Sequence, residues 1–98
     1  MRPTNNILKV LAILSRAPDV NHYPLHLSKE AKVNVGTVYS VLDRLEQGKY
    51  VSSALEDIDP KQAGRPQRRY YHISKEGRAY LNEHVGELRQ VLSEVSYA

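Results

Sequence analysis

Apolar residues recur at the spacing of one helix face in three segments of the first half of the chain. From about Thr4 to Ala17 they are Ile7, Val10, Leu11 and Leu14, widened by Leu8 and Ile13. A shorter segment from about Pro24 to Lys32 places Leu27 and Ala31 one turn apart. From about Val35 to Gln47 they are Val38, Val41, Leu42 and Leu45. This spacing is typical of amphipathic helices, so the sequence predicts three helices that pack through these residues.

Residues with known capping preferences mark the ends of these helices. Thr4 and Asn34 precede the first and third helices, where a side-chain oxygen can accept from free N–H groups of the first turn. Pro18 disfavours helix at the residue before it. Gly48 is expected to be the left-handed residue that ends the third helix. Because only residues 33–36 lie at the turn between the second and third helices, the pair is predicted to be a helix-turn-helix.

The hydrophobic period changes to two after the third helix. Residues 51–56 alternate between apolar and polar positions, which indicates a half-buried strand. Residues 69–73 are rich in aromatic and β-branched side chains and predict a second strand, with Tyr71 and Ile73 facing the core. The loop between them contains Asp59-Pro60 and Gly64-Arg65-Pro66. A hairpin directly after a helix-turn-helix is a wing.

A last helix is predicted from about Lys75 to Val95, capped by Ser74. Its apolar residues are spaced 4, 3, 4, 3, as in a heptad seam, and are Leu81, Val85, Leu88, Leu92 and Val95. The seam can pack on its own domain or on a second chain. Because the first three helices already supply a core, we expect pairing with a second chain.

The predicted fold class is therefore mainly α with a small β-hairpin (α+β). We expect a winged helix-turn-helix over residues 1–74 and a dimerisation helix over residues 75–98, forming one compact unit. A chain of 98 residues buries only about 60–65% of its unfolded surface, so dimerisation would add needed stability.

Composition narrows the classes of function. The chain has no cysteine, which fits a reducing compartment and excludes a disulfide scaffold. We expect a cytoplasmic protein without a membrane segment, because no signal-peptide pattern and no apolar run near ~20 residues is present. No phosphate loop, nucleophile elbow or paired-carboxylate pattern indicates an enzyme or a cofactor. His22 and His26 are four residues apart, but no carboxylate or thiol motif accompanies them, so we expect no metal site.

The charge distribution points to nucleic acid. The net charge is +3, and residues 61–69 contain four cations and no acid: Lys61, Arg65, Arg68 and Arg69. Cations on a hairpin can neutralise phosphates, and Gly64-Arg65-Pro66 can enter a narrow minor groove as an arginine-tipped arm. The alternative is a mobile hairpin whose charges only aid solubility.

The outward face of the third helix carries hydrogen-bonding side chains, namely Thr37, Tyr39, Ser40, Asp43, Arg44 and Gln47. The second helix of a helix-turn-helix enters the major groove with its N-terminal end first, and Arg44 is the candidate for a bidentate contact to guanine. Asp43 is expected to point past the groove or to pair with Arg44 or Lys49. The alternative is an ordinary solvated face. The expected DNA-binding residues are Thr37, Tyr39, Ser40, Arg44, Lys49, Lys61, Arg65, Arg68 and Arg69.

Two stretches of the sequence resemble PadR-type transcriptional regulators. The stretch similar to the family's recognition helix is Gly36-Thr37-Val38-Tyr39, then Val41–Glu46 and Gly48. The stretch similar to its wing, second strand and last helix is Gly64–Pro66, Arg69–Tyr71 and Ile73–Arg78. The resemblance extends over about residues 7–95. It implies a homodimeric winged-helix repressor whose C-terminal helix crosses to the partner subunit. It also implies that Thr37, Tyr39 and Ser40 contact DNA and that basic wing residues contact the backbone.

In many members of that family, phenolic or drug-like ligands bound near the dimer interface relieve repression. This chain contains no tryptophan and no phenylalanine to clamp a planar ligand. His22-Tyr23-Pro24 also lacks the glycine that the family has before the second helix. A small-molecule effector is left open, but no site for one is evident.

The sequence thus predicts a dimeric repressor or autoregulator on an inverted repeat of double-stranded DNA. Half-sites are expected one helical turn apart, roughly 34–36 Å. The alternative is a winged-helix module that binds another protein without specific DNA binding.

Overall fold

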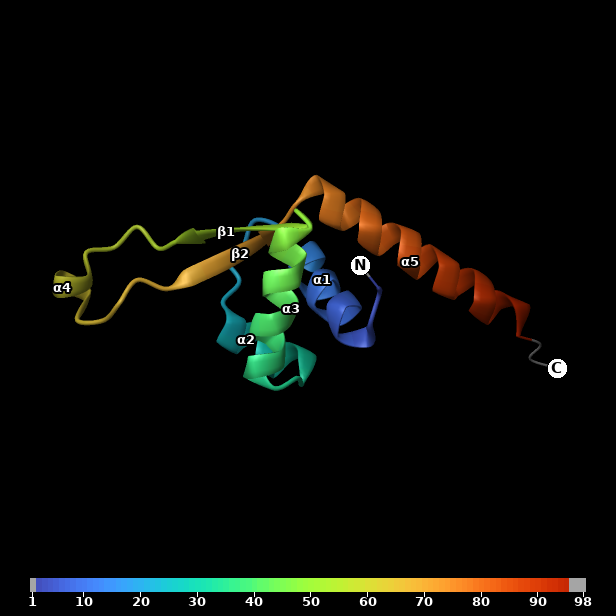
Figure 1. The fold of residues 1–98 in the computed structure, drawn as a ribbon, viewed down its shortest axis with the longest axis horizontal. Coiled ribbons are helices and arrows are strands. Elements are labelled where there is room, and N and C mark those ends of the chain that lie inside the picture. The colour runs from blue at the N-terminus through green and yellow to red at the C-terminus, as the bar shows by residue number, and fades with distance from the viewer. Residues whose placement is uncertain (1, 96–98) are drawn as a thin grey trace.

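Three short helices form the body of the molecule, and a hairpin and a long helix extend from it in opposite directions (Figure 1). The computed structural model describes residues 2–95. In chain order, its elements are α1 (Asn5–Arg16), α2 (Pro24–Ala31), α3 (Val35–Gln47), β1 (Val51–Leu55), α4 (Pro60–Ala63), β2 (Arg69–Ile73) and α5 (Lys75–Glu94). The predicted fold class, mainly helical with one antiparallel hairpin, is confirmed.

The predicted caps form at three helix starts. The Thr4 hydroxyl accepts from the Ile7 N–H at 3.2 Å, and the Asn34 side chain accepts from the Gly36 N–H at 2.8 Å. The Ser74 hydroxyl accepts from the Gly77 N–H at 3.0 Å. The bounds of α3 agree with the prediction, whereas α1 and α2 each end one residue earlier than expected and α5 ends at Glu94.

The residue that ends α3 differs from the prediction. Gly48 has a right-handed φ of −81°, and Lys49 takes the left-handed conformation instead, with φ 65°. Gly48 still serves a steric role, because a Cβ there would lie 2.6 Å from the ring of Tyr50 and the ring would have to shift. The glycine therefore makes room for the Tyr50 ring and supplies no positive φ.

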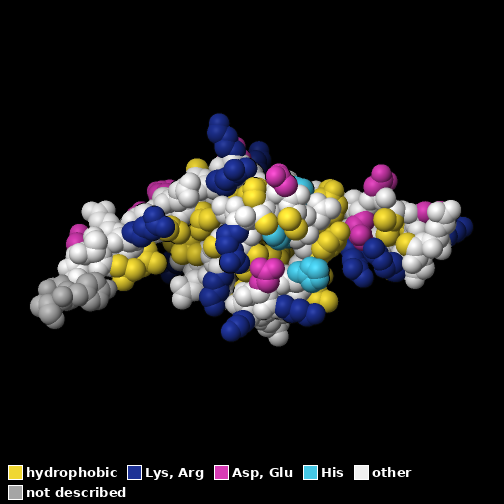
Figure 2. Space-filling view, turned by 180° about the vertical axis from the view of Figure 1, so that it is seen from behind, with side chains coloured by type: hydrophobic (Ala, Val, Ile, Leu, Met, Phe, Trp, Pro, Cys, Tyr) yellow, Lys and Arg dark blue, Asp and Glu magenta, His cyan; other side chains and the backbone are white. Residues whose placement is uncertain are grey.

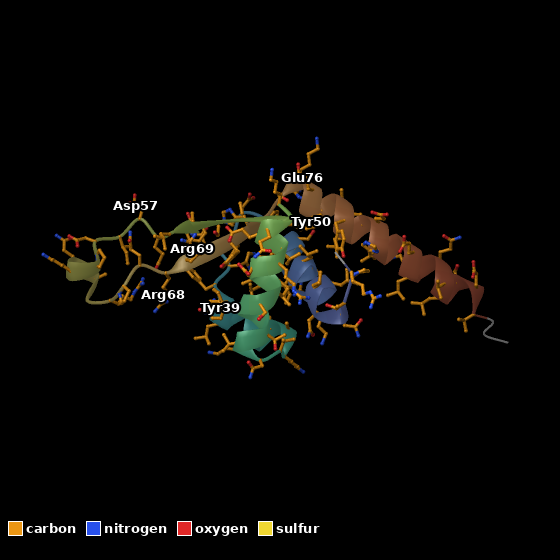
Figure 3. The ribbon with its side chains drawn as sticks, viewed as in Figure 1. Tyr39, Tyr50, Asp57, Arg68, Arg69 and Glu76 are labelled. Atoms are coloured by element: carbon orange, nitrogen blue, oxygen red, sulfur yellow. The ribbon has the colours of Figure 1, made fainter. Side chains whose placement is uncertain are left out.

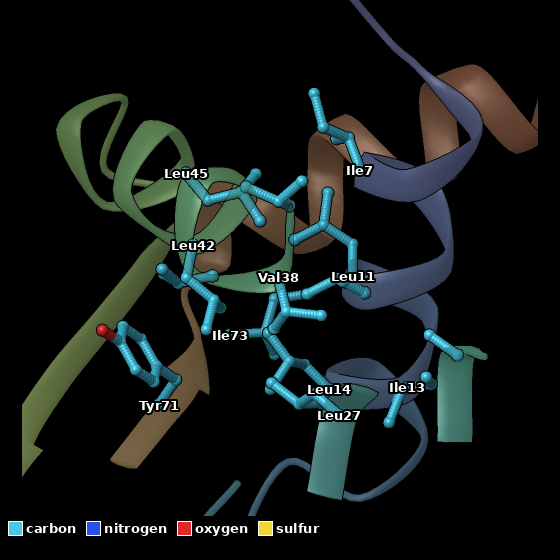
Figure 4. Close-up of a cluster of buried hydrophobic side chains, with 14 of the residues drawn as sticks. Ile7, Leu11, Ile13, Leu14, Leu27, Val38, Leu42, Leu45, Tyr71 and Ile73 are labelled. Carbon is cyan, nitrogen blue, oxygen red and sulfur yellow. The ribbon is translucent and has the colours of Figure 1, made fainter. Parts of the chain in front are cut away.

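The core forms where the helix stripes meet (Figure 4). Val38, Leu42 and Leu45 of α3 are fully buried, together with Leu11 and Leu14 of α1. The other residues of this cluster are Ile7, Val10, Ile13, Leu27, Ala31, Val41, Val51, Tyr71, Ile73, Tyr80 and Leu81. The predicted inward faces of α1, α2, α3 and β2 are therefore confirmed.

The hairpin is half-buried only at the end next to the body. Its strands pair antiparallel, from Val51 opposite Ile73 to Leu55 opposite Arg69. Val51 is 4% exposed, but Leu55 is 48% exposed, so the alternation expected along β1 fails at its outer end. Beyond Leu55 the wing projects from the body (Figure 1).

The loop of the wing contains a short helix that the hydrophobic pattern does not predict. This helix, α4, begins at Pro60 after Asp59, whose carboxylate accepts from the Lys61 N–H at 3.0 Å. It ends at Gly64, which is left-handed with φ 68°. Asp59-Pro60 and Gly64 were the local signals, and four residues are too few to show a hydrophobic period.

The start of α5 is anchored to the turn between α3 and β1. The Ser74 N–H donates to the Tyr50 carbonyl at 3.0 Å, and the Ser74 hydroxyl donates to the Lys49 carbonyl at 2.7 Å. Gly77 lies so close that a Cβ would overlap the Tyr50 carbonyl oxygen. The rings of Tyr50 and Tyr80 pack with centroids 4.7 Å apart. This junction determines where α5 leaves the body.

The predicted seam of α5 divides into two parts. Leu81 is buried and Val85 is half-buried against the chain's own core. Leu88, Leu92 and Val95 are 53%, 49% and 49% exposed. Residues 96–98 of the predicted C-terminal segment lie outside the described residues.

The junction predicts opposite effects of alanine at two glycines of α5. Gly77→Ala should destabilise the protein by about 1–3 kcal/mol or more, because backbone must shift to admit the methyl group. Gly86→Ala is the matched control, since a Cβ there meets nothing within 4 Å. It should stabilise by about 0.5–1 kcal/mol through helix propensity. Urea unfolding measures both, and equal effects would contradict the close approach at Gly77.

Candidate nucleic-acid interface

The packing of α3 leaves its opposite face open to solvent. Tyr39, Ser40 and Arg44 are exposed and Thr37 is half-buried. Tyr39 is the most apolar of them and has 57% of its surface exposed. The face therefore presents hydroxyl, aromatic and guanidinium groups on a rigid helix.

Of the two alternatives expected for Asp43, the pairing with Arg44 or Lys49 does not form. The Asp43 carboxylate accepts a hydrogen bond from the Gln47 side chain at 3.0 Å, one turn further along α3, and not from Arg44 or Lys49. Within residues 2–95, no ion pair involves Arg44. The Arg44 guanidinium is therefore available to an external acceptor.

A groove of about 520 Å³ lies between α2, α3 and the wing. It brings together Tyr39 from α3 with Arg68 and Arg69 from the wing, three of the residues expected to bind DNA. Figure 3 shows Tyr39 and Arg68 on the same side of the molecule, in the angle between α3 and the wing. The other residues that line the groove are Tyr23, Pro24, Leu25, His26, Gln67 and Tyr71.

The contribution of α2 to this groove was missed by the sequence analysis. Pro24 marked the start of α2, and a helix start carries partial positive charge from its aligned peptide dipoles. This was the only sequence signal available, because the side chains of Tyr23, Leu25 and His26 match no binding pattern. The groove combines two cations and a helix start with exposed aromatic and apolar side chains. The positive charge suits a polyanion, and the apolar side chains suit a ligand that also presents apolar groups.

Arg69 is oriented by a chain of side-chain contacts that reaches α3. Its guanidinium donates to the Ser53 hydroxyl at 2.9 Å. The Ser53 hydroxyl in turn donates to the carboxylate of Glu46 on α3. The base of the wing is thus connected to the C-terminal half of α3 through side chains as well as through the backbone.

Arg65 occupies a different position from the free arm that the sequence suggested. Its guanidinium donates to both carboxylate oxygens of Glu56, at 2.7 and 3.1 Å, and to the Pro66 carbonyl at 3.2 Å. Its contact with DNA stays a prediction, but the side chain is not a free cation.

The Arg65 guanidinium is the main cause of a low pKa at Glu56. It lowers the pKa of that carboxyl from its ordinary value of 4.5 to about 2, helped by the Arg68 N–H and the Tyr23 hydroxyl and opposed by partial burial. Because the pKa is lowered on folding, the ion pair contributes its full stabilisation above pH 4.5. This stabilisation is lost as the pH falls through about 2, where Glu56 becomes protonated. Glu56 and Arg65 therefore remain an ion pair at neutral pH.

Six of the nine expected DNA-binding residues do not line the groove, namely Thr37, Ser40, Arg44, Lys49, Lys61 and Arg65. Lys61 is exposed in α4, at the far end of the wing, and Lys49 follows the C-terminal end of α3. From behind, Lys and Arg side chains are spread over the body and part of the wing and do not form one patch (Figure 2). The structure therefore brings together some of the predicted cations and not others.

His22 is a structural residue of the core. It is 7% exposed, its Nε2 lies 2.8 Å from the Ala17 carbonyl, and its backbone pairs with Tyr71 in an isolated bridge. His26 belongs to α2, and residues 2–95 contain no group of three or more His, Cys, Asp or Glu residues placed to bind a metal ion. Through the bridge between His22 and Tyr71, the short segment before α2 pairs with β2 at a single residue.

Comparison with known proteins gives a family and a fold. The model of the transcriptional regulator PadR-like family matches residues 10–83, about three quarters of the chain. No curated protein matches the sequence.

Solved structures with the same fold include three bacterial proteins. S. aureus MepR (F27L mutant), bound to an oligodeoxyribonucleotide, is 19% identical with TM-score 0.69, over 96% of this chain and 67% of that one. Streptococcus pneumoniae FabT, in complex with DNA, is 23% identical with TM-score 0.63, over 97% and 64%. Lactococcus lactis ZitR, a zinc-responsive MarR family member, is 15% identical with TM-score 0.68, over 95% and 58%. The chain spans about three fifths to two thirds of their lengths, and at these identities the likeness establishes the winged-helix fold alone.

Proposed function

This chain belongs to the transcriptional regulator PadR-like family, and from that premise we propose that it is a homodimeric repressor or autoregulator of an inverted-repeat operator. The observation that carries the proposal is the groove in which α3 and the wing bring Tyr39, Arg68 and Arg69 together. The same fold occurs in MepR and FabT, whose structures contain DNA. Within residues 2–95, none of the helices has both the length and the apolar character that a membrane span requires. A regulator of this kind acts in the cytoplasm, where the DNA is.

In the proposed complex, α3 lies in the major groove. Thr37, Tyr39 and Ser40 are at its N-terminal end and contact phosphates or base edges, as the first turns of recognition helices do. Arg44, one turn further on, contacts a guanine with two hydrogen bonds. The wing lies over the adjacent backbone, where Arg68 and Arg69 neutralise phosphates. Lys49 and Lys61 add peripheral positive charge, and Arg65 contacts the DNA while it stays paired with Glu56.

The proposed dimer forms through α5. The outer half of this helix exposes Leu88, Val91, Leu92 and Val95, each by about half of its surface. A cluster of four exposed apolar residues on one helix is typical of a surface that another chain covers. A second copy would bury it with two-fold symmetry and place two α3 helices on two half-sites. Residues 2–74 then form the DNA-binding unit and α5 the dimerisation unit.

Salt dependence of binding tests the proposed function. The probe is a set of genomic fragments selected by their binding to the protein. If two wings make about six phosphate contacts, raising salt from about 50 to 200 mM should weaken binding about a thousandfold. Fluorescence anisotropy measures this. Weak binding that does not respond to salt would contradict DNA recognition and favour a winged-helix module that binds another protein.

Arg44→Ala tests the assignment of the guanine contact. It should weaken operator binding by about 1–3 kcal/mol and relax the preference at one base pair per half-site, because the bidentate contact is lost. Arg89→Ala removes the same charge from the outer half of α5 and should leave the preference intact. Binding measured against every single-base operator variant separates the outcomes. Equal weakening on all sequences would place Arg44 on a phosphate.

Leu88→Lys tests the dimer. A lysine in the middle of the exposed apolar cluster should shift the protein to monomer, since its charge would lose water at the interface. Gln90→Lys adds the same charge about 200° around the same helix and should leave the dimer intact. Light scattering coupled to gel filtration gives the mass of each variant. A Leu88→Lys protein with the wild-type dimer mass would exclude this face as the interface.

A further inference from the structure

Glu56 is the residue at which the ladder of the hairpin ends and the loop of the wing begins. Its N–H donates to the Arg68 carbonyl at 2.9 Å, one step beyond the last strand pair, Leu55 and Arg69. The Arg68 N–H then donates to the Glu56 carboxylate at 2.8 Å. The side chain thus extends the ladder after the strands have separated.

The same residue holds the returning side of the loop. Its carboxylate accepts from both terminal nitrogens of the Arg65 guanidinium, and its backbone carbonyl accepts from the Gln67 side chain at 2.8 Å. Gln67 also reaches the Ile58 carbonyl, at 3.4 Å. Three of the four residues from Arg65 to Arg68 are therefore bound directly to Glu56.

A third contact connects Glu56 to the body. The Tyr23 hydroxyl donates to the second carboxylate oxygen at 3.4 Å, and the Tyr23 ring packs edge-on against His26 and Tyr70. Tyr23 lies immediately before α2 and lines the groove with Arg68. The Glu56 side chain is only 14% exposed, which fits a group enclosed by its donors.

From these contacts we propose that Glu56 is a positioning residue for DNA binding: it orders the wing before DNA arrives and so sets Arg68 and Arg69 over the groove. The inference rests on the proposed function, because it concerns the same surface. An ordered wing binds with a smaller entropy loss than a free loop of twelve residues, 57–68. Glu56 itself touches no DNA in this proposal.

Two interpretations of Glu56 predict opposite changes in DNA affinity when its charge is removed. A carboxylate beside a DNA site repels phosphates, so electrostatics alone says that removing its charge should tighten binding. The positioning role says that removing the charge should weaken binding, since the ion pair with Arg65 and the bond from the Arg68 N–H both weaken. The sign of the change therefore decides between them.

The test compares Glu56→Gln with Asp57→Asn. Both substitutions remove one negative charge from adjacent wing residues, but Asp57 is exposed and has no ion pair or side-chain hydrogen bond within residues 2–95. On the same operator fragment, Glu56→Gln should bind about 5- to 10-fold more weakly than wild type. Asp57→Asn should bind as tightly as wild type or more tightly. Equal or tighter binding by Glu56→Gln would overturn the proposal.

Amide hydrogen exchange in the free protein supplies a readout that does not depend on DNA. The amides of Glu56 and Arg68 should exchange about 5- to 10-fold faster in Glu56→Gln, while the amides of α1 and α3 stay unchanged. Unchanged exchange in the wing would also overturn the proposal. If wild type binds no DNA but the exchange difference is present, the proposed function fails and the ordering role of Glu56 stands.

Arg65→Lys is the second variant, to be used if circular dichroism shows that Glu56→Gln does not fold. Lysine keeps the positive charge but cannot make two parallel bonds to a carboxylate. The proposal expects faster wing exchange and about 3- to 10-fold weaker binding, although the net charge is the same. Wild-type exchange and affinity in this variant would show that the geometry of the pair is not required.

Discussion

The burial of the inner stripe of α3 is the constraint on which the other features depend. Val38, Leu42 and Leu45 have no exposed surface, and they pack in the same core as Leu11 and Leu14 of α1. Rotation of α3 about its axis would expose these side chains, at a cost of about 1.5–3 kcal/mol each. The packing of the core therefore holds the opposite face of α3 toward solvent. The side chains on that face point outward without any interaction of their own.

The junction at Tyr50 connects the two parts that project from this body. Its backbone carbonyl accepts from Ser74 and lies against Gly77, while its ring packs on Tyr80. The hairpin and α5 leave the body from this one place, in opposite directions (Figure 1). A second subunit packed along α5 would thus be held at a defined angle to α3, which is what a fixed spacing of half-sites requires.

Some cations of the wing are bonded to other side chains of the protein, and others are exposed. Arg65 pairs with Glu56 and Arg69 bonds to Ser53, whereas Arg68 is exposed at the groove. Counting the basic residues of 61–69 therefore overstates the positive charge that a ligand meets. A wing that uses one arginine for its own order has fewer charges to offer but loses less entropy when it binds.

Local patterns in the sequence determined most of the fold. Residues i, i+3, i+4 and i+7 must share a helix face, so Val38, Val41, Leu42 and Leu45 predicted both the bounds of α3 and its outward residues. The caps at Thr4, Asn34 and Ser74 form for the same local reason, because each acts on N–H groups within three residues. The extension of the seam of α5 beyond the body was also readable, since spacing alone reveals it.

Only the tertiary structure decided the contacts between residues far apart in the chain. Gly48 makes room for the ring of Tyr50 and supplies no positive φ, and the same turn is bonded to Ser74, 25 residues after Lys49. Arg65 is paired because the loop brings it back to Glu56, nine residues earlier, where no periodic pattern operates. The start of α2 joins the groove because the wing lies beside it, as the contact from Tyr23 to Glu56 shows. Which faces exist follows from local spacing, whereas which side chains meet follows from how those faces pack.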